Sequence, residues 1–177
     1  MLRDIAKNAG VTTGALYGYF RNKEELFGGI VEEYYEGIQE MYCKHLEYFK
    51  GLSAENQMKE MENISVKGMI SLADYMYEHY DEFKLILCCS KDTSYCDLAE
   101  QMALLDEEAT REFAKTADMV GASVSPVPSR LEHILTTGLF TMFFELIIHD
   151  VPREEADEYI SKLTKFYLGG YRGIMGF

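Results

Sequence analysis

Hydroxyl, aromatic and basic side chains are concentrated between residues 12 and 23, a stretch that contains no acidic residue. Leu16 and Phe20, four residues apart, share one face of a helix, which predicts that both are buried. Thr13 and Tyr17 then lie on the opposite, exposed face. Hydroxyls and tyrosines on an exposed helix suit contacts with phosphates and base edges, so the chemistry expected here is nucleic-acid recognition.

Two short helices joined by a tight turn are needed to present these side chains. The residues expected to face inward on the first helix are Ile5, Ala6 and Ala9. Gly10 lacks a Cβ, as a tight helix exit requires, and Val11 is expected to turn inward after it. The hydroxyl of Thr12 or Thr13 can then cap the second helix. This order of features predicts a helix-turn-helix.

Residues 5 to 26 read IAxxAGVTxGALYxYFxxKEEL. This run resembles the DNA-binding motif of the TetR family of one-component transcriptional repressors almost position for position. The resemblance covers 25 of the 177 residues, from Arg3 to Phe27; the rest resembles the family in length and helical texture. It implies an all-α fold, in which a helix-turn-helix head is joined by a long helix to a larger domain that binds a ligand and dimerises.

The resemblance also implies roles for positions in this sequence. Those expected near DNA phosphates are Thr12, Thr13, Tyr17, Tyr19 and Lys23. Those expected at base edges are Ala15 and Gly18, and the family pattern also includes Gly14. For the two tyrosines, packing within a small bundle is the alternative interpretation.

The sequence departs from the family pattern in two ways. The family has another helix ahead of this motif, and a chain that starts at Met1 leaves no room for it. We therefore expect a DNA-binding domain of residues 1–46 that is incomplete at its N-terminus. Gly18 offers no side chain for base readout and weakens the helix by roughly 1 kcal/mol relative to Ala, so specificity would depend on few residues.

Net charge differs sharply between the two ends of the chain. Residues 1–23 contain four basic residues against Asp4 alone, a net charge of +3, so residues 24–177 carry −16 of the total −13. This polarity suits a molecule that presents one end to DNA. The N-terminus lacks the apolar stretch of a signal peptide, and no uninterrupted apolar run reaches the roughly 20 residues of a membrane span, so we expect a cytoplasmic protein.

The remaining pattern predicts a long linking helix and five further helices, and the five form a ligand-binding and dimerisation domain of residues 47–177. Asn22 caps a long helix to about residue 49, and Gly51 with Ser53 separates it from a helix over 54–79. A short helix over 82–89 follows, and Ser94 is expected to cap the next one. Residues 121–128, GASVSPVP, form the clearest break.

The two C-terminal helices favour homodimerisation. Ser129 is expected to cap a helix over 130–149 that is apolar on nearly every side, and a last helix follows Pro152. Two such helices from each chain would form a four-helix bundle, in which Gly138 and Gly170 permit close approach. The alternative is that both helices fill the core of a monomer.

Enzymatic and metal-binding interpretations find no supporting motif. The Glu-x-x-His pairing of carboxylate-bridged metal enzymes is absent, as are a nucleophile elbow, a phosphate loop and a dinucleotide fingerprint. The four cysteines form no CxxC pair, and buried thiols are a commoner interpretation of the group at 88, 89 and 96 than redox sensing. We expect no enzyme activity, metal or cofactor.

These features predict a ligand-responsive repressor that binds a palindromic operator as a dimer and is released by a small molecule. The alternative is a helical small-molecule-binding or interaction module without DNA binding. The excess of acidic residues outside the head favours a neutral or cationic effector over an anionic one. The side chains expected to bind it share a face of the helix after Ser129 and are His133, Thr137, Phe140 and Phe144.

Overall fold

The computed structural model describes residues 2–119, 121 and 125–176, in which every regular element is an α-helix. The helices are α1 (Leu2–Asn8), α2 (Thr13–Tyr19), α3 (Lys23–Lys50), α4 (Ala54–Glu78), α5 (Tyr80–Cys89), α6 (Leu98–Met119), α7 (Ser129–Ile148) and α8 (Arg153–Met175). The all-α fold expected from the sequence is confirmed.

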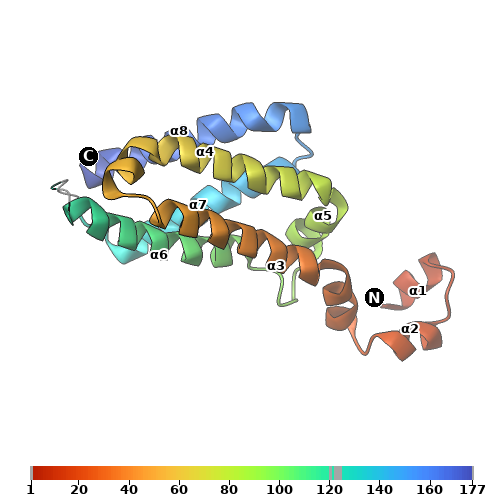
Figure 1. The fold of residues 1–177 in the computed structure, drawn as a ribbon. Helices are drawn as coiled ribbons and strands as arrows, with labels where there is room; N and C mark the ends of the chain where they lie inside the picture. The colour runs from red at the N-terminus through yellow and green to blue at the C-terminus, as the bar shows by residue number, and fades with distance from the viewer. Residues whose placement is uncertain (1, 120, 122–124, 177) are drawn as a thin grey trace.

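The helices form two parts of unequal size. Helices α3 to α8 pack into an elongated bundle, whereas α1 and α2 stand apart from it at the N-terminal end of α3 (Figure 1). In the following we call α1 and α2 the head and α3 to α8 the body. Within the body α6 packs against α7, α4 against α8, and α3 against α4, α5 and α6.

Aromatic and aliphatic side chains from α3 to α8 meet in one continuous core. The largest fully buried side chains are Phe83, Phe140, Phe143 and Phe144. Phe140 packs edge to face on Tyr42, with ring centroids 5.3 Å apart, and this contact ties α7 to α3. Burial of each such ring contributes about 1.5–3 kcal/mol to the packing of the helices.

The long helix α3 belongs to the body along most of its length. Phe27, Val31 and Ile38 are buried in the same core as the side chains of α4 to α7. The expected boundary between residues 46 and 47 would therefore cut through a continuous helix and its packed core. We place the junction between head and body at the start of α3, near Lys23.

Several predicted helix starts are confirmed, and two are wrong. Asn22 and Ser53 cap α3 and α4, with side-chain oxygens that accept hydrogen bonds from the amides of Glu25 and Asn56 at 2.9 and 3.4 Å. Ser129 caps nothing, because α7 starts one residue earlier than expected and Pro128 takes the cap position. Ser94 lies in the connection before α6, where its hydroxyl donates to Glu24 instead.

The predicted break at residues 121–128 separates α6 from α7, although residues 122–124 lie outside the described part of the chain. The amide of Ser125 donates to the carbonyl of Met175 at 2.8 Å, so Ser125 is held against the end of α8.

Helix α7 is central to the body but also exposes apolar side chains. By length and composition it is the one described helix that could cross a membrane, a test that the core helix of a soluble protein also passes. Its inner side chains Phe140, Phe143 and Ile147 are fully buried, whereas Ile134 is 65% exposed. On the neighbouring α8, Phe166 is 70% exposed. Both helices therefore leave apolar surface without a partner in the described chain.

The two glycines expected to permit close approach between subunits differ in their surroundings. A Cβ at Gly138 would lie 2.9 Å from the hydroxyl oxygen of Tyr167, so this glycine makes room for α8 of its own chain. A Cβ at Gly170 would meet nothing within 4 Å. Of the two, only Gly170 remains available for contact with a second subunit.

Candidate functional site

The turn between α1 and α2 has the geometry of a helix-turn-helix. Gly10 has a φ of +67°, which is the left-handed conformation that favours glycine. The amide of Val11 donates to the carbonyl of Ala6 at 3.0 Å and the amide of Gly10 to that of Lys7 at 3.3 Å, which together close a Schellman motif. The predicted tight exit at Gly10 is therefore confirmed.

The start of α2 is fixed by Thr12. Its hydroxyl oxygen accepts a hydrogen bond from the amide of Ala15 at 3.1 Å, so Thr12 is the N-cap and Thr13 is the first helical residue. Because the hydroxyl accepts this bond, its own proton remains available for donation to a phosphate.

The inward face of the head differs in part from the expectation. Leu2 and Ala6, four residues apart, are buried, and Leu16 and Phe20 are half-buried. Ile5 is 43% exposed, because it lies about 100° round the helix from the inward row. Val11 is also exposed and does not turn inward as expected.

The outer face of α2 is open to solvent. Gly14, Ala15 and Gly18 are exposed, and a Cβ at either glycine would meet nothing within 4 Å. Tyr17 is exposed, and Tyr19 is 82% exposed. Neither tyrosine therefore packs into a bundle within the described chain, which disfavours the structural alternative for both. A nucleic acid could contact all five positions at once.

Lys23 begins α3 next to this face and is exposed. Its ammonium donates to the carbonyl of Lys91 at 3.5 Å, a long contact that leaves its other hydrogens free. The neighbouring Arg21 pairs with Glu25, whose carboxylate also accepts the amide of Arg21 at 2.6 Å. These bonds tie the residue that follows α2 by two positions to the first turn of α3.

The connection between α5 and α6 holds the head end of α3. Oε1 of Glu24 accepts hydrogen bonds from the amide and the hydroxyl of Ser94, at 3.0 and 2.6 Å, and these bonds lower the pKa of Glu24. The hydroxyl of Tyr95 lies against Gly28, where a Cβ would come within 2.6 Å of it. We refer to Glu24, Gly28, Ser94 and Tyr95 as the junction cluster.

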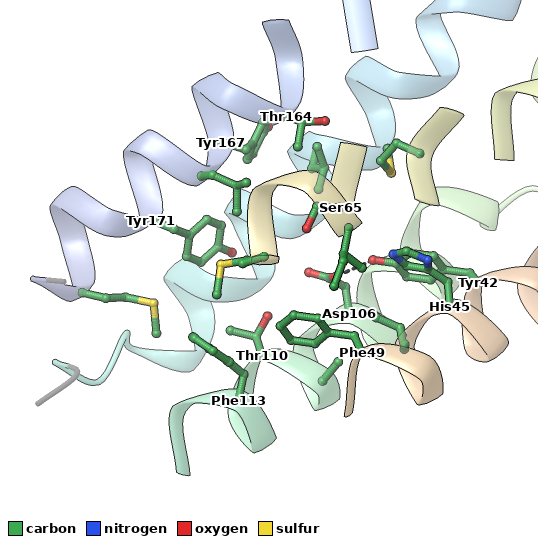
Figure 2. A pocket seen from close by; sticks show the side chains of 18 residues that line it. Tyr42, His45, Phe49, Ser65, Asp106, Thr110, Phe113, Thr164, Tyr167 and Tyr171 are labelled. Carbon is green, nitrogen blue, oxygen red and sulfur yellow. Dashed lines mark hydrogen bonds between the residues drawn. The ribbon is translucent and has the colours of Figure 1, made fainter. Parts of the chain in front are cut away.

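A cavity of about 150 Å³ lies within the body at the opposite end of α3 from the head. Figure 2 shows side chains that reach it from α3, α4, α6 and α8, and Leu139 of α7 completes the wall. Its rings come from Tyr42, Phe49, Phe113, Tyr167 and Tyr171. A concave, largely apolar site with a few polar groups is the usual form of a small-molecule pocket.

One carboxylate faces this aromatic cavity. Asp106 accepts a short hydrogen bond from the hydroxyl of Tyr42 (Figure 2). Burial raises the pKa of Asp106 and this hydrogen bond opposes the rise, while burial and the charge of Asp106 raise the pKa of Tyr42 well above its usual value. His45 also lines the cavity, and burial lowers the pKa of its imidazole, which favours the neutral form.

The side chains predicted to bind a ligand do not line this cavity. Phe140 and Phe144 are core residues, and the hydroxyl oxygen of Thr137 is buried without a hydrogen-bond partner among the described residues. His133 points to α6, where its Nδ1 lies 2.9 Å from Glu107 and its Nε2 lies 3.5 Å from Glu100. The face that carries these four residues packs on α3 and α6 instead.

Some of the residues that line the cavity could have been predicted from the sequence. On α6 the inner row includes Met102, Ala109 and Phe113, and Asp106 falls in the same row, four residues after Met102. A carboxylate within an apolar row indicates a buried polar site. That Tyr42 and Tyr171 would meet it from α3 and α8 depends on the packing of the body, which has no local signal.

The fold and the head define the class of protein. An all-helical chain whose exposed helix-turn-helix lies at one end of a long connecting helix has the architecture of a helix-turn-helix DNA-binding protein. Residues 1–30 match the family model described as bacterial regulatory proteins, tetR family. The match covers α1, α2 and the start of α3, and it supports a DNA-binding transcriptional regulator of the tetR type. Neither the curated proteins nor the solved structures gave a significant match.

Proposed function

We propose that this protein is a repressor that binds a two-fold symmetric operator as a homodimer and releases it when a small molecule occupies the cavity. The observation that carries the proposal is that α3 belongs to both sites. Lys23 and Glu24 lie at its head end, whereas Tyr42 and His45 line the cavity about 28 Å further along the helix, at a rise of about 1.5 Å per residue.

Dimerisation is supported by the apolar surface of α7 and α8. Ile134 and Met142 on α7 and Phe166 and Ile174 on α8 are exposed, and a Cβ at Gly170 would meet nothing. Pairing of this surface with its copy would bury all five positions and form a four-helix bundle. A two-fold interface of this kind would place two heads side by side, as a palindromic operator requires.

Within each head, α2 would enter the major groove. Thr12, Thr13, Tyr17, Tyr19 and Lys23 would contact phosphates, and the short side chains at Gly14, Ala15 and Gly18 would let the helix approach the base edges closely. The acidic remainder of the chain would be repelled by DNA, which favours a single orientation. We expect such a regulator to act in the cytoplasm, where its DNA is.

Release requires that the ligand binds better to the form of the protein that does not bind DNA. A ligand in the cavity would touch Tyr42 on α3 and Asp106 on α6. Both helices lead back to the junction cluster, because α3 carries Glu24 and Gly28, and α6 follows directly after Ser94 and Tyr95. A shift of α3 relative to α6 would thus change the position of the head.

The phosphate and base contacts can be separated by fluorescence anisotropy on labelled duplex DNA. Lys23→Ala is expected to weaken binding to all sequences alike and to lower the salt slope by about 1. Ala15→Ser, at a position assigned to the base edges, is expected to change the preferred sequence. If Lys23→Ala binds every duplex as tightly as the wild type, the assigned orientation of α2 is wrong. A chain that binds ligand but no DNA would favour the helical binding module instead.

A further inference from the structure

The charges around the cavity are unbalanced. Among the described residues that line it, Asp106 is the one carboxylate, and there is no lysine or arginine. His45 is the remaining basic side chain, and its burial favours the neutral imidazole. An anionic ligand would therefore meet a negative charge and no positive one.

The surroundings of Asp106 reinforce this negative potential. No lysine or arginine forms an ion pair with it in the described part of the chain, and the charge of the adjacent Glu107 raises its pKa further. Burial raises the pKa of Tyr171 to about 12, and the negative charges of Asp106, Glu132 and Glu107 act in the same direction. A cation placed here would relieve this repulsion.

Asp106 has unused capacity to accept hydrogen bonds. A carboxylate can accept about four, and the hydroxyl of Tyr42 supplies one. An ammonium group carries hydrogens that only donate, which matches the free acceptor sites. The bond between Tyr42 and Asp106 also holds the carboxylate in place at the wall of the cavity (Figure 2).

The aromatic rings of the cavity wall also favour an organic cation. Aromatic faces attract cations electrostatically, and they contact the apolar part of the same molecule. Phe49, Phe113, Tyr167 and Tyr171 surround the space beside Asp106 (Figure 2). A cavity of about 150 Å³ is comparable with one known to hold a single benzene ring. A metal ion fits poorly, because no group of three metal-ligating side chains occurs among the described residues.

We propose that the cavity selects a small arylalkyl amine, in which an aromatic ring is joined to a protonated alkylamine. Asp106 is its counter-ion, and the surrounding rings contact its apolar part. This proposal rests on the proposed function in that it names the class of effector for the same site. Its central element is the Asp106 carboxylate, unpaired by any basic side chain of the cavity wall.

Three ligands of similar size but different charge test this selectivity by isothermal titration calorimetry. Phenethylamine is cationic at neutral pH, phenethyl alcohol is neutral and phenylacetate is anionic. We expect the amine to bind at least about tenfold more tightly than the alcohol, as one charge-assisted hydrogen bond provides, and phenylacetate to bind more weakly than either. If the alcohol or phenylacetate binds as tightly as the amine, or if none of the three binds at millimolar concentration, the proposal is wrong.

Asp106→Asn tests the counter-ion directly, because asparagine keeps an oxygen that can accept the hydrogen bond from Tyr42. The variant should lose the preference for the amine and keep its affinity for the alcohol. Glu108→Gln is the matched control, since it removes an exposed carboxylate from the same helix outside this cavity. Equal loss in both variants would contradict a specific role for Asp106. If Asp106→Asn does not fold, the order of the three affinities for the wild-type protein still tests the selectivity for the amine.

Operator affinity measured in the same experiments separates this proposal from the proposed function. If the amine binds selectively but leaves operator affinity unchanged, release by the ligand is wrong and the selectivity stands. If the protein binds DNA specifically but the alcohol or phenylacetate equals the amine, the selectivity is wrong and DNA recognition stands.

Discussion

At the scale of single residues, buried aromatic rings dominate the stability of the body. Phe140 is fully buried against Tyr42 and Phe144. We predict that Phe140→Ala lowers the free energy of unfolding by about 3–5 kcal/mol, because it leaves a cavity that its neighbours fill only in part. Tyr48→Ala, at an exposed position, should change it by less than about 0.5 kcal/mol. Urea denaturation followed by circular dichroism measures both, and similar losses would contradict the described core.

His133 predicts a pH dependence of stability. The hydrogen bond to Glu107 raises the pKa of the imidazole above 6.5, and the charges of Glu100 and Glu107 add to this. Because the pKa is higher in the folded state, the stabilisation is complete below the unfolded pKa and is lost as the pH rises through the folded pKa. The Tm difference between wild type and His133→Gln should therefore shrink as the pH rises from below 6.5 through the raised pKa of His133 in the folded protein. A difference that stays constant or grows with pH would show that the pair does not form.

At the scale of helices, the junction cluster is where the body holds the head. Replacing Ser94 with alanine removes the hydroxyl that donates to Glu24 and leaves the backbone bond in place. We predict that Ser94→Ala reduces the effect of ligand on operator affinity, which is typically about 5- to 150-fold in coupled systems. Its affinity for ligand alone should stay within about twofold of the wild type.

The control for this prediction is Glu36→Gln, an exposed change on α3 remote from the junction cluster in sequence. Paired titrations of ligand and operator give the coupling for each variant. Unchanged coupling in Ser94→Ala, or an equal change in Glu36→Gln, would locate the connection between the two sites elsewhere.

Comparison of the helices with the sequence-based predictions shows which structural features the sequence could predict. The tight turn at Gly10 and the caps at Asn22 and Ser53 depend on neighbours a few residues away, and their local patterns predicted them correctly. Ser94 has the same capping pattern, but a contact with Glu24, 70 residues away, fixes its role. His133 does not line the cavity for the same reason, because the packing of α7 on α6 turns it towards Glu107. Local signals predicted the elements, and tertiary packing decided which faces form the cavity.

At the scale of the whole molecule, the exposed apolar surface of α7 and α8 predicts a dimer. Ile134→Glu combined with Phe166→Glu would place two charges per subunit in a dry interface, which is strongly unfavourable. Analytical ultracentrifugation should show dimers for the wild type and monomers for the double variant. Tyr48→Glu adds a charge at an exposed position outside this surface and should remain dimeric. A monomeric wild type at micromolar concentration would refute the interface.

The central claim is that α2 reads DNA sequence in a symmetric pair of heads. Repeated selection of binding sites from random duplex DNA, followed by anisotropy on the winning sequence, tests it most directly. We predict an enriched sequence with two-fold symmetry, bound by a dimer, whose affinity falls by at least about tenfold in a Thr13→Ala, Lys23→Ala double variant, because a hydrogen bond to a charged phosphate contributes about 1.5–3 kcal/mol and the lysine contact is lost as well. No enriched sequence, or undiminished binding by the double variant, would contradict the claim.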